Sequence, residues 1–330
     1  MTATLDQFAT IPRILIEVPL RPVQGSRFQP TGFPNLGAAE FRTPDGATSI
    51  LVESAQSMAN RLENTIWDPV AGDLLGAFQG LPYVTARVGD RETDSIREAH
   101  RLNSPYLFPG ISERLQEKAG VVASSKKKAG AGEAGESSGV DIMKLARAIF
   151  YFDPNSVLHG IFLEKLVGTA RLTRVLSAFI EASDANAAES GGVKNDRVDP
   201  VGAKFGGAVK GFGNVPFTRT EYTAKRIVAY FSLDCGLLRS YGLGREAEDL
   251  LVAIGLWKIR KFLEVGGRLR TACDLEPLHE GEALKATRPA GCDVPSAVDL
   301  ERIIRESIEG CKAGGMFAEP PRTEVVFSLA

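Results

Sequence analysis

Residues 20–37 read LRPVQGSRFQPTGFPNLG and directly follow the apolar segment 13–20. Three glycines and three prolines make this stretch too rich in helix and strand breakers to be either element, so it predicts a shaped loop. Glycines let a backbone come close to a ligand, arginines can neutralise phosphates, and phenylalanines offer flat faces on which bases stack. This composition suits a single-stranded nucleic acid. The side chains that carry this chemistry are Arg21, Arg27, Phe28 and Phe33.

The segments on either side of this loop have clear periodicities. Ile14, Ile16, Val18 and Leu20 stand at alternate positions, which is typical of a strand with one buried face. After the loop, residues 52–67 follow the spacing of a helix. Its apolar side is formed by Ala55, Met58, Ala59, Leu62 and Ile66. The opening order is therefore strand, loop, helix.

The rest of the chain mixes helical and strand patterns. A helix is expected at residues 141–152, and Asp153-Pro154 should stop it. Since helices and strands are interleaved with long insertions, the predicted fold class is α+β. The other expected elements are helices at 245–264 and 298–309, and strands at 157–163, 174–182, 226–238 and 268–276.

Residues 119–139, AGVVASSKKKAGAGEAGESSG, are of low complexity, small and polar. They offer too little apolar surface to offset the entropy of ordering them, so this segment is expected to be disordered. Its three lysines, Lys126 to Lys128, are interpreted as solvated charge rather than as a polyanion site.

Composition excludes several classes of protein. The chain has 330 residues and 44% hydrophobic residues, enough for one large domain or two ordinary ones. No apolar run approaches the roughly 20 residues that cross a bilayer, and the N-terminus lacks a signal-peptide pattern, so a cytoplasmic protein is expected. Four cysteines without CxxC pairing and three scattered histidines suggest neither zinc nor a disulfide framework. With a net charge of −2, any nucleic-acid site must come from local clustering of cations.

A second basic, glycine-rich region lies at 191–213. Its end overlaps KGFGNVPF at 210–217, which nearly matches the RNA-binding strand motif K/R-G-F/Y-G/A-F-V-x-F/Y. Asn214 replaces an aromatic residue, and Pro216 cannot donate to a sheet ladder, so a loop or hairpin with the same chemistry is predicted. The alternative is a turn whose phenylalanines fill the core. The candidate contacts are Lys194, Arg197, Lys204, Lys210 and Arg219 for phosphate, with Phe212 and Phe217 for stacking; Asp196 and Asp199 oppose the charge.

A third glycine pattern, Gly242 to Ala247, fits G-x-G-x-x-A, the dinucleotide-binding motif, if a strand precedes it and a helix follows. Glu264 lies about 20 residues on but falls inside the expected helix, and Asp274 is the better acidic candidate. A tight strand-to-helix turn explains these glycines without a ligand.

No catalytic constellation is evident. His159 lies in an apolar stretch expected to be a strand and is interpreted as a core histidine. Glu53, near the start of the expected helix, is interpreted as complementing the helix dipole. Trp257 belongs to an apolar helical stripe with Leu250 and Ile254, which indicates core.

Several unusual segments resemble, in the same order, the backbone subunit of type I-G (formerly I-U) CRISPR surveillance complexes, a family of the RAMP superfamily. The resemblance runs from about Arg13 to Glu276. The segments are RPVQGSRFQPTGFPNLGAAEF, LVESAQSMANRLE, LSAFIEASDA, SGGVKNDRVDP, GFGNVPFTRTEYTA and LWKIRKFLEVGGRLRTACDLE.

The resemblance implies a single RAMP-type domain over residues 1–330. Its palm would be of modified RNA-recognition (RRM), ferredoxin-like type, with an inserted finger and a thumb-like hairpin. The implied parts are a palm from about 13–67, 141–182 and 226–276, an insert containing 119–139, a thumb-like insertion at 191–222, and a C-terminal helix and tail at 277–330.

It also implies a subunit without catalytic activity or cofactor, many copies of which polymerise along a CRISPR guide RNA (crRNA). Gln24, Gly25, Ser26, Arg27 and Phe28 would lie on the guide's backbone, and the region from Lys194 to Arg219 would reach a neighbouring copy. The implied partners are crRNA, the target DNA strand, further copies, the large subunit and Cas5- or Cas6-like end-capping subunits, with a helicase-nuclease acting indirectly.

Two alternatives stay open. The first is a CRISPR RNA-processing endoribonuclease of the same superfamily, with His159 or His100 as base. The second is a nicotinamide-dependent oxidoreductase that uses Gly242 and Gly244.

Overall fold

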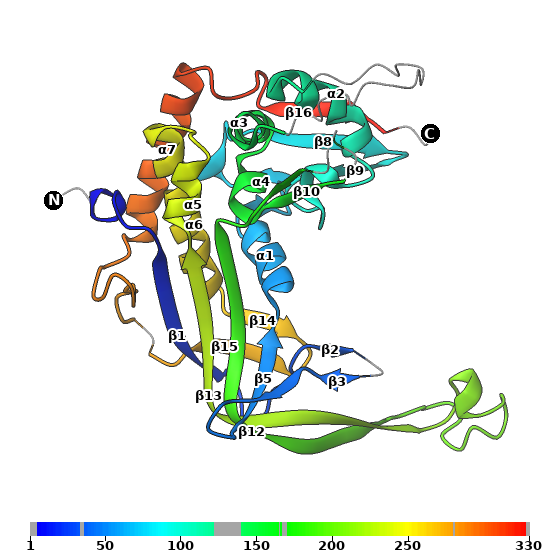
Figure 1. Cartoon of the computed structure of the whole chain (residues 1–330). Helices are drawn as coiled ribbons and strands as arrows, with labels where there is room; N and C mark the ends of the chain where they lie inside the picture. The colour runs from blue at the N-terminus through cyan, green and yellow to red at the C-terminus, as the bar shows by residue number, and fades with distance from the viewer. Residues whose placement is uncertain are drawn as a thin grey trace, which may run out of the picture.

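A computed structural model describes residues 5–33, 36–121, 140–164, 166, 170–279 and 281–327. Its centre is a seven-stranded sheet in which every neighbouring pair is antiparallel (Figure 1). The mixed α and β content of the expected fold class is thus confirmed. In order across the sheet, the strands are β14 (Gly267–Arg270), β15 (Cys273–Pro277), β1 (Ile14–Pro22), β13 (Val215–Leu233), β12 (Leu176–Lys194), β5 (Thr48–Glu53) and β4 (Glu40–Arg42).

The strand predicted at residues 13–20 is β1, which continues to Pro22. Ile14, Ile16 and Leu20 are buried and Glu17 is exposed, as the alternation requires. The loop that follows contains a short hairpin of two strands, each two residues long: β2 (Gly32–Phe33) and β3 (Gly37–Ala38).

Two helices cover one face of the sheet. α1 (Ala55–Asn64) contacts β12, and α6 (Arg245–Glu264) contacts β13, as predicted for 245–264. Gly255 allows this close approach, because a Cβ there would stand 3.1 Å from Leu233 Cδ1. Trp257 packs edge-on against Phe78 and is core, as expected. The helix predicted at 298–309 is α7 (Ala297–Ala313), which packs on α6.

The helix predicted at 52–67 begins too early, because residues 52–53 end β5 and the Ser54 side chain accepts from the Ser57 amide to cap α1. Glu53 therefore ends β5, one residue before the cap of α1 and outside its first turn. Its buried carboxylate pairs with Arg61 and Arg270, two contacts that the helix-dipole interpretation did not include.

Three predicted strands needed correction. The stretch 157–163 is α4 (Pro154–His159) followed by β10 (Ile161–Leu163), because Asp153 caps a new helix through the Ser156 amide. The stretch 226–238 ends as a strand at Leu233, where Asp234 caps α5 (Cys235–Ser240). The stretch 268–276 is the hairpin β14–β15 rather than one strand.

The upper lobe in Figure 1 is built around a three-stranded sheet of β16 (Arg322–Val326), β8 (Tyr83–Val88) and β9 (Arg91–Asp94). The C-terminal strand β16 pairs with β8 in parallel. The lobe also holds α2 (Phe108–Ala119), the hairpin of β10 and β11 (Ala170–Leu172), and α3 (Ile142–Phe152), which is the predicted helix at 141–152. The remaining short elements are β6 (Trp67–Asp68), β7 (Asp73–Leu74), η1 (Asp6–Phe8), η2 (Gly76–Phe78), η3 (Arg101–Asn103) and η4 (Ala208–Lys210).

β12 and β13 are each 19 residues long and continue far beyond the sheet as a two-stranded ribbon. Figure 1 shows this ribbon projecting to the same side as the upper lobe. We call residues 185–194 and 215–224 the ribbon and residues 195–214 its tip. The strand predicted at 174–182 is the first half of β12, whose continuation through Gly191 and Gly192 to Lys194 was not predicted.

The segment expected to be disordered, residues 119–139, begins at Ala119, which is the last residue of α2. Its residues 122–139 lie outside the described residues. No helix within the described ranges is both long and apolar enough to cross a membrane. All four cysteines are free thiols, and Cys235, Cys273 and Cys311 are buried.

Candidate nucleic-acid interface

The loop after β1 and the base of the ribbon enclose a hollow of about 380 Å³. Gln24, Gly25, Ser26 and Arg27 line one side and Arg219 lines the other, so residues about 190 positions apart meet here. Gly25 has φ +70°, a conformation that favours glycine at this turn. We call this site the base hollow. Its lining is Pro22, Val23, Gln24, Gly25, Ser26, Arg27, Arg219, Glu221, Ala272 and Asp274.

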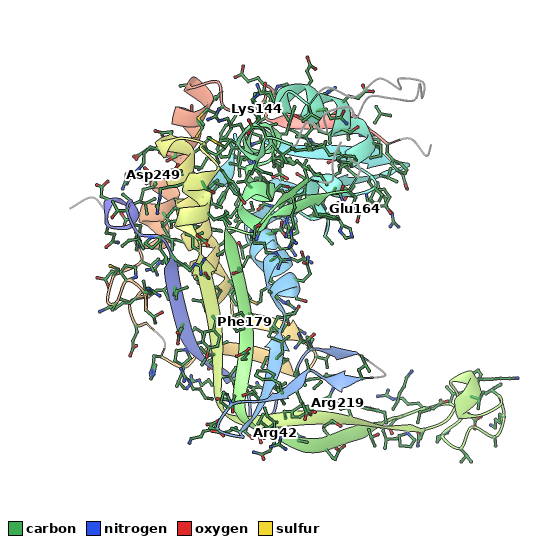
Figure 2. The ribbon with its side chains drawn as sticks, in the orientation of Figure 1. Arg42, Lys144, Glu164, Phe179, Arg219 and Asp249 are labelled. Atoms are coloured by element: carbon green, nitrogen blue, oxygen red, sulfur yellow. The ribbon has the colours of Figure 1, made fainter. Side chains whose placement is uncertain are left out.

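A buried carboxylate holds both arginines of the base hollow. Glu221 is 2% exposed, and its oxygens lie 3.2 Å from Arg27 Nη1 and 2.5 Å from Arg219 Nη2. Arg27 also donates to Ser190 Oγ at 3.3 Å, while Arg219 Nε is buried without a hydrogen-bond partner in the described part of the chain. Because one carboxylate serves two guanidinium groups, the trio keeps a net positive charge. Figure 2 labels Arg219 on the ribbon close to the sheet.

Phe28 does not offer a stacking face, contrary to the sequence expectation. Its side chain is fully buried. Its backbone exchanges two hydrogen bonds of 2.9 Å with Tyr222 of β13. Phe28 therefore anchors the loop to the sheet, because burying its apolar ring is more favourable in free energy than exposing the ring to water. The Phe33 side chain lies outside the described residues.

Arg21 lies on β1 opposite Glu276 of β15, and its Nε is 2.8 Å from the Glu276 carboxylate. It is not among the side chains that line the base hollow. Its charge is thus partly neutralised, and its part in any nucleic-acid contact stays a prediction.

The tip carries the other predicted cations on a loop held by two aspartates. Asp196 accepts the backbone amides of Val198, Asp199 and Gly213, which lower the pKa of its carboxyl, with the Gly213 bond contributing most. Asp199 accepts the Lys204 amide at 2.8 Å. The two aspartates, expected only to oppose the basic charge, therefore organise the loop. The cations that this loop and the adjoining ribbon end present are Lys194, Arg197, Lys204 and Lys210.

The tip also exposes many apolar side chains. Phe205 and Phe212 contact each other with ring centroids 5.2 Å apart, yet both stay well exposed, and Val209 is fully exposed. Exposed apolar residues are ordinary when scattered singly, whereas several on one projecting element are typical of an interaction surface. The exposed apolar residues of the ribbon and tip are Val193, Val198, Val201, Phe205, Val209, Phe212 and Phe217.

The motif at 210–217 spans the end of the tip and the start of β13. Pro216 pairs with Val193 in the ribbon, beyond the part of β13 that lies inside the seven-stranded sheet, so the motif forms one side of a hairpin, as predicted. Asn214, which replaces the aromatic residue of the motif, accepts the Asp196 amide at 2.8 Å. Phe217 is half exposed and its ring lies over Gly192, so the core-filling alternative was wrong for this residue.

The dinucleotide motif lacks its strand. The helix α5, rather than a strand, precedes Gly242, whose carbonyl accepts two hydrogen bonds from Arg147. Gly244 begins α6, and Glu264 ends it in an ion pair with Lys261. Asp274, the other acidic candidate, lines the base hollow. The glycines therefore serve a helix-to-helix turn.

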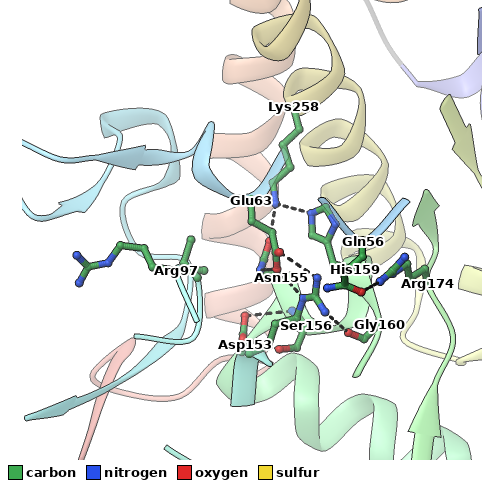
Figure 3. A network of polar contacts seen from close by, with 12 residues as sticks. Gln56, Glu63, Arg97, Asp153, Asn155, Ser156, His159, Gly160, Arg174 and Lys258 are labelled. Atoms are coloured by element: carbon green, nitrogen blue, oxygen red, sulfur yellow. Dashed lines mark hydrogen bonds and ion pairs between the residues drawn. The ribbon is translucent and has the colours of Figure 1, made fainter. Parts of the chain in front are cut away.

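Figure 3 shows a buried polar network between α1, α4 and α6. Arg101 is fixed by both oxygens of Glu63, at 2.5 and 2.9 Å. The Lys258 side-chain nitrogen donates to the side-chain oxygen of Asn155 and lies 2.9 Å from His159 Nε2. His159 is fully buried, and this burial, with the Lys258 charge, lowers its pKa well below 6.5. It is a core histidine, as expected, but on a helix rather than a strand. Across the described ranges, no cluster of His, Cys, Asp or Glu is placed to hold a metal ion.

Glu221 is the residue of the base hollow that sequence reasoning missed. The alternation Arg219, Glu221 on one strand is the available signal, because residues two apart lie on the same face.

Comparisons with known proteins give one family match. The family model described as CRISPR-associated protein GSU0053 (Cas_GSU0053) matches residues 14–187, just over half of the chain. Among solved structures, the chain is similar to one described as a "CRISPR RNA-guided surveillance complex, pre-nicking", with 12% identity and a TM-score of 0.40. The similarity covers 80% of this chain and 73% of that chain. No curated protein matches the chain.

Proposed function

The chain belongs to the CRISPR-associated protein GSU0053 family, a Cas7-type family, and from this premise we propose that it is a non-catalytic subunit that binds CRISPR guide RNA. The base hollow is the observation that carries the proposal. Arg27 and Arg219 are held on one buried carboxylate beside the exposed backbone of residues 24–26. Guanidinium groups and loop amides bind phosphate and ribose without reading base edges.

The order of the central strands supports a palm of the RNA-recognition type. β15-β1-β13-β12, with α1 between β1 and β12 and α6 between β13 and β15 along the chain, is the β-α-β-β-α-β arrangement. In our proposal this unit is the palm, the upper lobe is the finger, and the ribbon with its tip is the thumb.

The tip would contact a neighbouring copy of the same chain. Its exposed phenylalanines and valines supply apolar surface, and its lysines and arginine supply charge. A copy that reaches its neighbour with one projecting element makes a head-to-tail contact, which generates an open filament when the rotation does not close. The guide strand would run along such a filament. The target DNA strand, the large subunit and the end-capping subunits are the further partners that we propose.

A guide must keep its bases free for pairing, so a grip on phosphate and ribose suits this role. The net charge of −2 is also compatible with it, since copies that pack side by side need acidic surfaces opposite basic ones.

The endoribonuclease alternative has less support. His159 is fully buried against Lys258, whereas a general base must come within hydrogen-bond reach of the ribose hydroxyl. His100 is exposed and keeps that alternative testable. Incubation of the protein with CRISPR repeat RNA should leave the RNA intact, and cleavage that is lost in His100→Ala would favour the alternative.

Arg27→Ala should weaken binding to RNA of every sequence alike, because it removes a phosphate contact. The slope of log affinity against log salt should become shallower by about 0.7. Fluorescence anisotropy with two RNAs of unrelated sequence, at several salt concentrations, measures this. Arg305→Ala is the matched control, since the Arg305 side chain is exposed to the same extent (56% against 55%) and also pairs with a glutamate. A loss confined to one RNA sequence would contradict the proposal.

A further inference from the structure

A second and larger hollow, of about 1020 Å³, lies between the β10–β11 hairpin, η3 and α1. We call it the hairpin pocket. Its size suits a small organic ligand, and about half of the residues that line it are polar or charged. Figure 2 shows Glu164, which lines it, on the side of the upper lobe that faces the ribbon. The lining residues used below are Gln56, Asn60, His159, Phe162, Arg171 and Arg174.

The hairpin presents an aromatic ring and a guanidinium group side by side. Phe162 pairs with Arg171 across the two strands, so both side chains lie on the same face of the hairpin. Their strand neighbours Ile161 and Leu172 are buried, whereas Phe162 is 45% exposed and Arg171 is exposed. An exposed ring beside an arginine is the arrangement on which a base stacks and its phosphate is neutralised.

A second guanidinium group in the pocket, that of Arg174, has no ion pair with a carboxylate among the described residues. Arg174 donates to the side-chain carbonyl of Gln56. Arg101, by contrast, is fully engaged by Glu63. Partial burial, and then the Arg101 charge, lower the pKa of Arg174. An anion placed beside Arg174 and Arg171 would therefore be stabilised by both.

Polar atoms in the pocket's lining residues also lack partners. Asn60 Oδ1 and His159 Nδ1 are buried without a hydrogen bond among the described residues. Lys258 contacts the His159 ring through Nε2, so Nδ1 is the ring nitrogen left without a partner among the described residues. Two buried polar atoms are thus unsatisfied, which is uncommon for buried groups in a native protein.

We infer that the hairpin pocket binds one nucleotide of a single-stranded nucleic acid, with the phosphate on Arg171 and Arg174 and the base on Phe162. The inference rests on the proposed function, because it adds a second contact on a strand that the base hollow holds elsewhere. The pocket accounts for a nucleotide better than for an apolar ligand, because its two guanidinium groups and its exposed ring match the phosphate and the base of a nucleotide.

The test compares Phe162→Leu and the double variant Arg171→Ala/Arg174→Ala with the wild type, by anisotropy with RNA and DNA oligonucleotides of one sequence. Phe162→Leu should weaken binding about tenfold, because stacking is lost while apolar bulk is kept. The double variant should make the salt slope shallower by about 1.4. Arg305→Ala should change neither quantity. The melting temperatures of Phe162→Leu and of Arg171→Ala alone should stay close to that of the wild type, because Phe162 and Arg171 are exposed.

The outcomes separate this inference from the proposed function. Losses on RNA assign the pocket to the guide, and losses on DNA alone assign it to the target strand. If the wild type binds RNA and both variants bind RNA and DNA as well as the wild type does, the pocket inference is overturned while the proposed function stands. If the wild type binds no single-stranded RNA, both fail. Photocrosslinking of 4-thiouridine RNA provides the second measurement, and a crosslink to the Phe162 peptide is expected.

Discussion

At the scale of single residues, Phe28 separates a structural role from a binding role. The same ring, read in a loop with two arginines, fits base stacking, yet it is fully buried and its backbone is bonded to β13. What distinguishes the two roles is the direction in which the chain turns after Pro22, and that direction depends on pairing with Tyr222, about 190 residues later.

Phe28→Ala should therefore lower the free energy of unfolding by about 3–5 kcal/mol, since it empties a packed site in the core. Phe28→Leu should keep most of that stability and should bind RNA as the wild type does. Urea unfolding measures the stability, and anisotropy measures the binding. A stable Phe28→Leu protein that no longer binds RNA would restore the stacking role.

Lys258 gives a residue-scale prediction about pH. Burial lowers the pKa of Lys258 from 10.5 to about 7 in the folded chain, partly offset by the charges of Glu63 and Asp153. Between pH 7 and 10 the unfolded chain holds a proton that the folded chain lacks, so stability rises with pH in that window. Below about pH 7 Lys258 is protonated in both the folded and the unfolded chain, so lowering the pH further changes stability no more through this group.

The free energy of unfolding of the wild type should consequently rise by about 1.5 kcal/mol from pH 7 to 8.5, relative to Lys258→Met over the same range. The comparison uses the difference in slope, because Lys258→Met also removes hydrogen bonds to Asn155 and His159 and shifts stability at every pH. Equal slopes in the two proteins would show that Lys258 keeps its ordinary pKa.

At the scale of elements, the tip is a unit that folds on its own contacts. The hydrogen bonds of Asp196 and Asp199 all end within the tip, and Lys194 faces Val215 where the ribbon begins. An Asn-Gly turn can join strands in this register.

Replacing residues 195–214 by Asn-Gly should therefore leave the melting temperature of the single chain nearly unchanged while it abolishes association on RNA. Val209→Ser should weaken association without unfolding the tip, because Val209 is fully exposed. Val70→Ser is the control and should have no effect, because Val70 is an apolar residue, 95% exposed, in the turn between β6 and β7. Unchanged association in the Asn-Gly variant, measured by light scattering with RNA, would remove the tip from the interface.

Local patterns predicted the helices more accurately than the strands. α3, α6 and α7 agree with their predicted ranges because their caps and apolar stripes lie within the segment itself. α4 was mistaken for a strand because six buried residues in succession carry no periodicity, and only the Asp153 cap identifies it. The continuation of β12 beyond residue 182 was not predicted because glycine favours a turn, whereas Gly191 and Gly192 lie within a paired strand that continues to Lys194.

The candidate site was predictable to a similar degree. The cations of the base hollow and the tip were recognised from composition, since arginine and lysine beside glycine are a local signal. Glu221, Arg171 and Arg174 were not, because their roles depend on which strands become neighbours. Long-range pairing thus decides where a cation or an anchor lies, and composition decides only that it is present.

At the scale of the whole molecule, three features share one side. The ribbon and the upper lobe project in the same direction from the sheet, and Glu164 of the hairpin pocket lies on the part of the lobe that faces the ribbon (Figures 1 and 2). In our proposal, a nucleic-acid strand bound in the hairpin pocket would lie on this side of the molecule. A ribbon from the next copy could then close over the same strand.

This arrangement predicts that RNA length sets the number of copies. In our proposal each copy binds one stretch of RNA and contacts the next copy through its tip. A longer RNA therefore binds more copies, because a head-to-tail contact that does not close sets no limit on their number. The mass of the complex, measured by size-exclusion chromatography with light scattering, should rise in proportion to RNA length, with a constant 260/280 nm absorbance ratio. The Asn-Gly variant at residues 195–214 should bind the same RNAs without this proportional growth. A complex of fixed mass over a threefold range of RNA length would instead indicate a closed oligomer, and the head-to-tail filament would have to be abandoned.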